Sequence, residues 1–161
     1  MTQFIDFTQP AGTNFQFQAP FDGAIYTVVV TWSLFGVRYY VNIYDLSGNL
    51  IGSRPMVGSP SAVLLESIVN DSQTAIATTS LPHQLPIGSL LNLTIAGVTP
   101  DDYNGTFACR ILNETQFSFQ LPTNPSDAIS LGNVAYNINL AGGYFSTQLV
   151  WRPANNQFEI I

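Results

Sequence analysis

The residues that could support acid–base, nucleophilic or metal chemistry are few in this sequence. The chain has one histidine, His83, one cysteine, Cys109, and one adjacent carboxylate pair, Asp101 and Asp102. A lone histidine and a lone cysteine cannot provide the four ligands of a structural zinc site, and neither His-Glu-x-x-His nor Cys-x-x-Cys spacing occurs. The single cysteine also excludes an intramolecular disulfide, so cysteine usage leaves the redox compartment undetermined.

A Cys109–His83 dyad is the one nucleophile–base pair that the composition permits. Cys109 lies on the apolar side of the alternating stretch 106–111, which indicates a buried cysteine that packs as a small apolar side chain. His83 follows Pro82 and precedes Pro86, which indicates a turn. Both positions argue against a dyad, so we expect no enzymatic activity, and a hydrolase remains the third of three functional hypotheses.

Asp101 and Asp102 raise the alternative of a calcium site. They open the loop 101–105, Asp-Asp-Tyr-Asn-Gly, in which Asp and Asn can hydrogen-bond the backbone and Gly can take a positive φ. The ligand spacing of an EF-hand is absent. The sequence therefore favours turn chemistry over calcium binding, and no metal or cofactor is expected.

The composition predicts an apolar core beneath an unusually uncharged surface. Apolar residues make up 46% of the 161 residues and charged residues 9%, against ~25% in typical soluble domains. Lysine is absent and the net charge is −6, which argues against nucleic-acid binding because phosphate contacts need clustered cations. The four cations are Arg38, Arg54, Arg110 and Arg152.

Three interpretations of this surface stay open. Asn, Gln, Ser, Thr and aromatic side chains would suit a protein covered by partners, one that contacts carbohydrate, or an ordinary polar β-protein. No apolar run approaches the ~20 residues needed to span a bilayer, so we expect no membrane insertion. The N-terminus lacks a basic region followed by an apolar stretch and a cleavage site, so no signal peptide is predicted.

The stretch 23–57 predicts a three-stranded meander around which the rest of the chain packs. β-Branched and aromatic residues alternate along it with a period of two, which is typical of strands with one buried face. The segment 33–36 can close the first turn, and 45–49 contains a Gly-Asn pair that tolerates the positive φ of short hairpins. The expected strands are 23–32, 39–44 and 50–57.

A second β-module is expected between residues 69 and 130. Its three alternating stretches suffice for a small sheet or barrel, although a marginal one. The stretch 61–67 stays undecided between a helical turn and an irregular crossing. The expected module strands are Leu91–Ile95, Phe107–Ile111 and Phe117–Leu121.

Strand patterns before and after this module complete a discontinuous domain. No stretch of ten residues has a helical period, so the fold class is all-β. We expect an antiparallel barrel or sandwich, formed by 1–68 and 131–161, that is interrupted by a small β-barrel at 69–130. The further expected strands are an edge strand at 15–18 and strands at 134–140, 144–151 and 158–161.

Aromatic side chains are the remaining binding signal. Trp32, Tyr40, Tyr44, Tyr103 and Trp151 are candidates for sugar stacking or for anchoring a protein interface. The alternative is that most of them fill the β core. Alternation places Tyr40 and Tyr44 opposite the apolar face of their strand.

Short patterns on either side of the expected module carry a family resemblance. They are Asn14–Phe17, Arg38–Asp45, Gly48–Ile51, Val57–Pro60, Leu140–Arg152 and Phe158–Glu159. These stretches resemble the cyanophage-type baseplate plug family of contractile phage tails. The resemblance covers roughly 1–68 and 131–161, and it rests on short patterns rather than a catalytic signature. Members are usually compact, and this chain departs from them by carrying residues 69–130.

The inserted segment carries a second set of short motifs, Ala75–Thr78, Pro82–Ser89, Ile95–Val98, Asn104–Phe107 and Thr115–Phe119. They are similar to the small β-barrel called the first catalytic-cysteine half-domain of ubiquitin-activating enzymes. Relatives of this barrel occur in phage tail proteins, and the similarity implies no catalysis by Cys109.

Together the two resemblances imply a structural virion protein, made in the host cytoplasm and built into the tail baseplate near the tube–spike junction. The expected partners are other baseplate, tail-hub and tube proteins, with self-association in three- or six-fold rings and no nucleic-acid contact beyond proximity to the channel. The alternative is a carbohydrate-binding tail decoration that contacts the host surface, with Tyr103 and its loop as the binding element.

Overall fold

The computed structural model describes residues 2–8, 14–60 and 62–161, and it is all-β, as the sequence predicts. Its one helical element is the three-residue 3-10 turn Asp101–Tyr103, so no helix in these ranges is long enough to cross a membrane. The chain divides into two compact units, residues 1–59 with 137–161 and residues 60–136. The strands are β1 Gln3–Asp6, β2 Phe15–Phe21, β3 Ala24–Ser33, β4 Arg38–Tyr44, β5 Leu50–Pro55, β6 Val63–Asp71, β7 Thr74–Thr79, β8 Leu90–Ala96, β9 Gly105–Ile111, β10 Gln116–Gln120, β11 Asn133–Ala135, β12 Leu149–Arg152 and β13 Gln157–Ile160.

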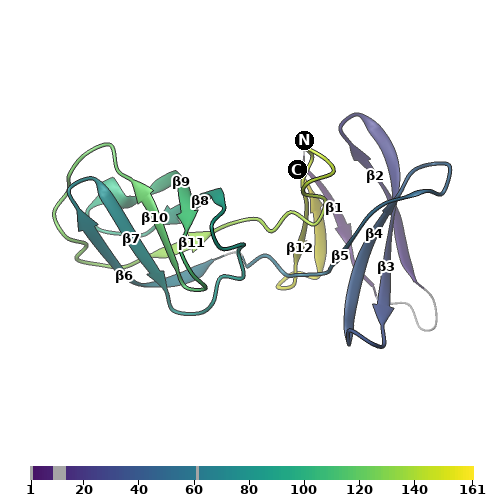
Figure 1. Ribbon diagram of the computed structural model, residues 1–161, viewed down its shortest axis with the longest axis horizontal. Coiled ribbons are helices and arrows are strands. Elements are labelled where there is room, and N and C mark those ends of the chain that lie inside the picture. Colours follow the sequence, from purple (N-terminus) through teal and green to yellow (C-terminus); the bar gives the residue numbers. More distant parts are fainter. Residues whose placement is uncertain (1, 9–13, 61) are drawn as a thin grey trace. The chain divides into compact units, whose positions relative to one another are not determined.

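The first unit is a sandwich of two antiparallel sheets, which we call the sandwich unit. One sheet has the order β2-β3-β4-β5, and the other has the order β1-β13-β12 (Figure 1). Side chains from both sheets share one core, and aromatic rings join the layers: the Phe17 and Phe158 ring centroids are 5.4 Å apart. Strand β1 pairs with β13, so residues from opposite ends of the chain complete one sheet.

The expected meander is confirmed in β3, β4 and β5. Val28 and Val30 on β3, and Val41 and Ile43 on β4, are all buried, as their alternation predicts. The β4–β5 turn uses Gly48 at φ 82°, the positive value expected of its Gly-Asn pair. β2 is an edge strand next to β3, as the pattern before Pro20 predicts.

Asp22, between β2 and β3, ties this sheet to the loop before β12. Its carboxylate accepts hydrogen bonds from the backbone N–H groups of Ser146 and Thr147, both at 2.9 Å, and from the Thr147 hydroxyl at 2.9 Å. These bonds, the one from Ser146 first, hold the pKa of Asp22 below its ordinary value of 3.8. Because they favour the charged form, they stabilise the folded state when Asp22 is ionised.

We expect acid to remove this contribution. The pKa of Asp22 is lower in the folded than in the unfolded chain, so its stabilisation is complete above pH 3.8 and is lost as the pH falls through the folded pKa. Asp22→Asn should therefore lower the urea midpoint at pH 7, and its difference from the wild type should shrink below pH 4 (about the unfolded value). A difference that stays constant from pH 7 to the acid limit would contradict this role.

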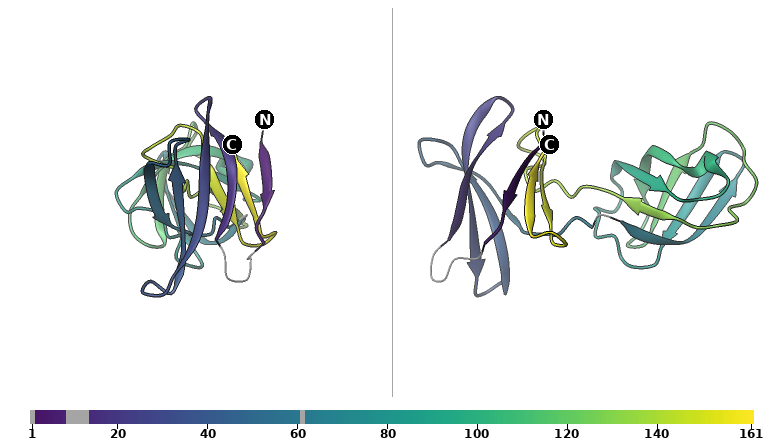
Figure 2. Two further views of the ribbon diagram at one scale, coloured as in Figure 1. Left: turned by 90° about the vertical axis from the view of Figure 1, so that its right-hand side faces the viewer. Right: turned by 180° about the vertical axis from the view of Figure 1, so that it is seen from behind.

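The second unit is a closed barrel of six antiparallel strands in the order β10-β7-β6-β11-β8-β9, which we call the barrel unit (Figure 2). The three strands expected from alternation correspond to β8, β9 and β10. The short strand β11 closes the barrel, because it pairs with β6 on one side and β8 on the other. Leu93, Ile95, Cys109, Ile111 and Phe117 lie in its core with 1% exposure or less.

The structure moves both boundaries of the insertion. The barrel unit is 60–136 rather than 69–130, because 63–71 forms strand β6 and 133–135 forms strand β11. The undecided stretch 61–67 is thus largely strand, apart from residue 61, which lies outside the described residues. Two expected strands are shorter than predicted: 134–140 is extended only in β11, and 144–151 only from Leu149 onward.

Candidate functional site

His83 and Cys109 do not form a catalytic pair. His83 is 1% exposed, and its Nδ1 accepts the backbone N–H of Leu85 at 3.1 Å, so its proton lies on Nε2. Burial lowers the pKa of His83 and so favours the neutral imidazole. Backbone hydrogen bonds with Gln116 and Asn113 and the charge of Glu114 act in the opposite direction but are outweighed. No described hydrogen bond joins His83 to Cys109.

Cys109 is an inert core residue, as the sequence predicts. It is fully buried on β9, and its thiol donates a hydrogen bond to the carbonyl of Phe107 at 3.4 Å. Burial raises the pKa of this thiol to about 12. Because the thiolate is the nucleophile, a thiol with this pKa cannot serve in nucleophilic catalysis near neutral pH.

Asp101 takes part in the hydrogen-bonded turn expected at 101–105, whereas Asp102 accepts a hydrogen bond from the Thr123 hydroxyl at 2.6 Å. The Asn104 side chain accepts the N–H of Val98 at 2.9 Å and donates to the Val98 carbonyl at 2.8 Å and to Asp101 at 2.6 Å. Gly105 takes φ 138°, a positive value as expected. Throughout the described ranges, no group of three His, Cys, Asp or Glu side chains could hold a metal ion.

Two of the five aromatic candidates are core residues, and for these the interface prediction is wrong. Tyr103 is fully buried, and its hydroxyl donates to the carbonyl of Ser126 at 3.0 Å. It therefore anchors the long loop before β11 and cannot stack on a sugar. Trp151 is 8% exposed and packs edge-on against Phe7, with ring centroids 5.3 Å apart. Both residues face inward because a large aromatic ring is the most effective filler of a small β core.

The other three aromatic candidates lie on or near the surface of the β3–β4 ribbon. Trp32 is 47% exposed, and its ring packs edge-on against Tyr39 at 4.8 Å. Tyr40 and Tyr44 are partly buried on the face opposite Val41, as alternation predicts. Tyr40 lies against the turn itself, because a Cβ added at Gly36 would come within 3.3 Å of its ring.

The turn between β3 and β4 carries an exposed apolar surface that the sequence analysis missed. Leu34 is 83% exposed, Val37 is 72% exposed and Phe35 is completely exposed. With Trp32 they form what we call the hairpin tip, at the end of the β3–β4 ribbon. Turns normally carry Gly, Pro, Asn, Asp or Ser. The two consecutive large apolar residues in the segment 33–36 were therefore the sequence signal for an exposed apolar surface at this turn.

The hairpin tip has a defined backbone. The Gly36 N–H donates to the Ser33 hydroxyl at 3.1 Å, and Val37 takes φ 48°, an unusual conformation for a β-branched residue. Arg38 follows directly, and its Nε donates to the Gly36 carbonyl at 3.4 Å. The tip is therefore a hydrogen-bonded turn with a cation, Arg38, at its base.

A second surface feature lies on the barrel unit. A concave pocket of about 480 Å³ is lined by the apolar residues Pro82, Leu85 and Ile87, together with Gln84 and Glu114. We call it the barrel pocket. It lies in the connection between β7 and β8 and borders the turn before β10.

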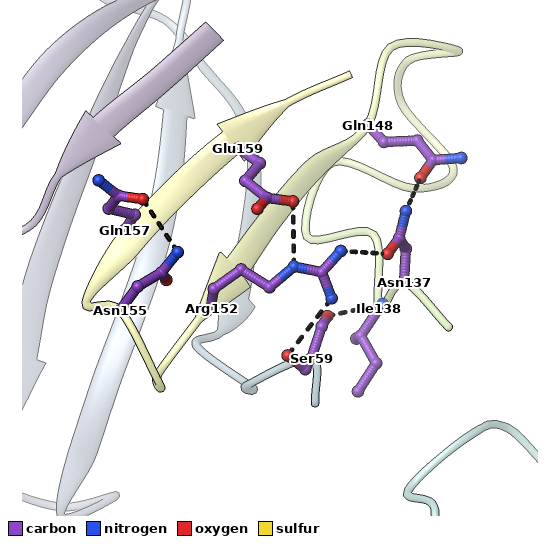
Figure 3. Close-up of polar contacts among 8 residues, drawn as sticks. All are labelled: Ser59, Asn137, Ile138, Gln148, Arg152, Asn155, Gln157 and Glu159. Carbon is purple, nitrogen blue, oxygen red and sulfur yellow. Dashed lines mark hydrogen bonds and ion pairs between the residues drawn. The ribbon is translucent and has the colours of Figure 1, made fainter. Parts of the chain in front are cut away.

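Arg152 joins the two segments of the sandwich unit at which the chain leaves this unit and returns to it. Its Nε donates to Glu159 at 3.0 Å, its Nη2 to the Asn137 side chain at 2.6 Å and its Nη1 to the Ser59 carbonyl at 3.4 Å. The buried Ser59 hydroxyl also accepts the N–H of Ile138 at 2.8 Å (Figure 3). Because the chain leaves the sandwich unit after residue 59 and re-enters it at residue 137, Arg152 holds these two segments together.

The described residues thus include two surface features suited to contact with a partner. They are the apolar hairpin tip on the sandwich unit and the barrel pocket on the barrel unit. In comparisons with known proteins, no family model, curated protein or solved structure matches this chain.

Proposed function

We propose that this protein is a structural component of a contractile phage tail, a plug-type baseplate protein near the tube–spike junction that acts by protein–protein assembly. The observation that carries the proposal is the hairpin tip. Exposed apolar residues gathered at the end of a two-stranded ribbon are typical of a surface that a partner covers. The placement in a phage tail rests on the resemblance of residues 1–68 and 131–161 to the plug family.

The composition supports assembly over other roles. Interface cores are depleted in charged residues, and this chain has only 9% of them and no lysine. The expected partners are tail-hub and tube proteins, to which the tip would contribute an aromatic anchor, Phe35, surrounded by aliphatic side chains. The chemistry at His83, Cys109 and Asp101 offers no competing catalytic role.

The test is tail assembly by phage particles that carry a variant of the hairpin tip. Leu34→Ser combined with Phe35→Ser should leave the isolated protein folded, because exposed surface substitutions change stability by about 0.5 kcal/mol or less. In infected cells we expect particles without functional contractile tails, as loss of a buried aromatic anchor costs an interface about 2 kcal/mol or more. The measurement is the fraction of tailed particles in electron micrographs.

The matched control is Leu46→Ser, in the β4–β5 turn of the same sheet, where the leucine is also largely exposed. We expect normal tails from this variant. Mass spectrometry of tails separated from heads gives an independent check, since the chain should occur in the tail fraction. Its absence from purified particles would refute the proposal, whatever the effect of the tip variant.

A further inference from the structure

We propose that the hairpin tip of one copy of this protein inserts into the barrel pocket of a second copy, in a head-to-tail contact. The inference rests on the proposed role of the tip as an assembly surface, and it names one partner of that surface: the chain itself. It follows from two features on different units that match in size, polarity and charge.

The two surfaces match in polarity and size. The tip is a group of four exposed apolar side chains, of which Phe35 is completely exposed and Leu34 is 83% exposed. The barrel pocket, at about 480 Å³, falls in the range of about 300–1,000 Å³ that encloses small ligands. Its apolar lining suits one or two such side chains. Leu81 and Leu90, both more than 60% exposed, flank the pocket segment in sequence and extend its apolar surroundings.

The pocket is held in shape before any partner arrives. The backbone N–H of His83 donates to the Glu114 carbonyl at 2.9 Å, and its carbonyl accepts the Tyr136 hydroxyl at 2.8 Å. The Ser89 hydroxyl donates to the Pro86 carbonyl at 2.6 Å. A preformed site loses little conformational freedom when it is filled, which favours binding. The His83 side chain contributes as well, because its Nδ1 accepts the backbone N–H of the pocket residue Leu85 at 3.1 Å.

The charges match as well. Arg38 stands at the base of the tip, and Glu114 lines the pocket; both side chains are exposed. Among the residues with described positions, the one ion pair joins Arg152 and Glu159, so Arg38 and Glu114 both lack an opposite charge. Insertion of the tip would bring these two charges to the same interface, where complementarity fixes the register.

The contact joins two different patches, so it is heterologous. Such contacts form rings where the rotation closes and filaments where it does not. The tip has only four apolar residues, whereas a standard interface has about 20–30 residues on each side. A single contact is therefore weak, and we expect self-association that rises with concentration over roughly micromolar to millimolar protein.

The test is a mixing experiment with the full-length chain in sedimentation velocity. One variant, Phe35→Ser with Leu34→Ser, lacks the tip but keeps the pocket; the other, Ile87→Glu, lacks the pocket but keeps the tip. Each alone should associate at least about tenfold more weakly than the wild type. An equimolar mixture should form dimers, because the intact tip of one chain fits the intact pocket of the other. A contact between two tips would give no such recovery.

Charge exchange gives a second test that leaves the apolar surfaces unchanged. Arg38→Glu and Glu114→Arg should each weaken association by about two- to fivefold, and the double variant should recover it. Circular dichroism confirms that each variant is folded. A wild type that stays monomeric, or a mixture that does not associate, would overturn the inference. Neither result would affect the proposed tail role, which is judged by the tail fraction of particles.

Discussion

Trp151→Ala should lower the free energy of unfolding of the sandwich unit by about 3–5 kcal/mol, as truncation of a large buried aromatic does. Trp151 lies on β12 inside the shared core, where its ring centroid is 4.9 Å from that of Phe158 and 5.3 Å from that of Phe7. Its removal leaves a cavity between the two sheets that rigid β-strands cannot fill. This loss is a large part of the 5–15 kcal/mol that typically stabilises a domain.

The matched control is Trp32→Ala, which removes the same side chain from an exposed position. Trp32 is 47% exposed and packs against Tyr39, so we expect a loss of about 1 kcal/mol or less. Urea unfolding, followed by circular dichroism, compares the two variants. Similar effects of both substitutions would mean that Trp151 does not lie in the core.

Gly132→Ala should open the barrel unit at the seam where β11 closes it. A Cβ at this position would lie 1.8 Å from the carbonyl oxygen of Ala96 and 2.7 Å from the carbonyl carbon of Gly97, both backbone atoms that cannot rotate away. The Gly132 carbonyl also accepts the N–H of Leu65 at 3.0 Å. Because the clash can be relieved only by moving the strand, we expect a loss of about 3 kcal/mol or more.

Cys109 provides the measurement for this variant. The thiol is fully buried with a pKa of about 12, so in the wild type it should react with iodoacetamide only after the barrel opens. Gly132→Ala should speed this labelling by about a hundredfold or more, the factor that 3 kcal/mol represents when opening precedes the reaction. Gly88→Ala is the control: Gly88 has φ 83° but nothing within 4 Å of an added Cβ, so only backbone strain of about 1–2 kcal/mol is expected. Equal labelling rates in both variants would contradict the prediction that Gly132 must lack a side chain for β11 to close the barrel.

The local residue pattern was sufficient to identify a strand and its buried face where neighbouring strands in the sheet also follow each other in sequence. Val28 and Val30 alternate with exposed or half-buried residues, and this alternation alone identifies β3 and its inward face. It was not sufficient for β11, because three residues are too few to show a period. Strand β6 was missed for a different reason: its apolar run 63–65 has no alternation, and its partners β7 and β11 are what define it.

The aromatic candidates show the same limit. Trp32 and Trp151 both stand in strands, and nothing in their local sequence separates them. Trp151 is buried because β12 lies in the second sheet beneath Phe7, a residue 144 positions away whose ring completes the pocket around it. The exposure of Trp32 follows from its place near the end of the ribbon, beyond the core.

The sequence by itself determined the all-β class, the central meander, the presence of an inserted barrel, and the burial of Cys109. Each depends on residue type and on a period of two, which are local properties. Only the tertiary structure decided the insertion boundaries, the burial of Tyr103 and Trp151, the exposed hairpin tip and the barrel pocket. Each of these depends on which distant segment covers a side chain, and the contacts that cover it are made between strands far apart in the chain.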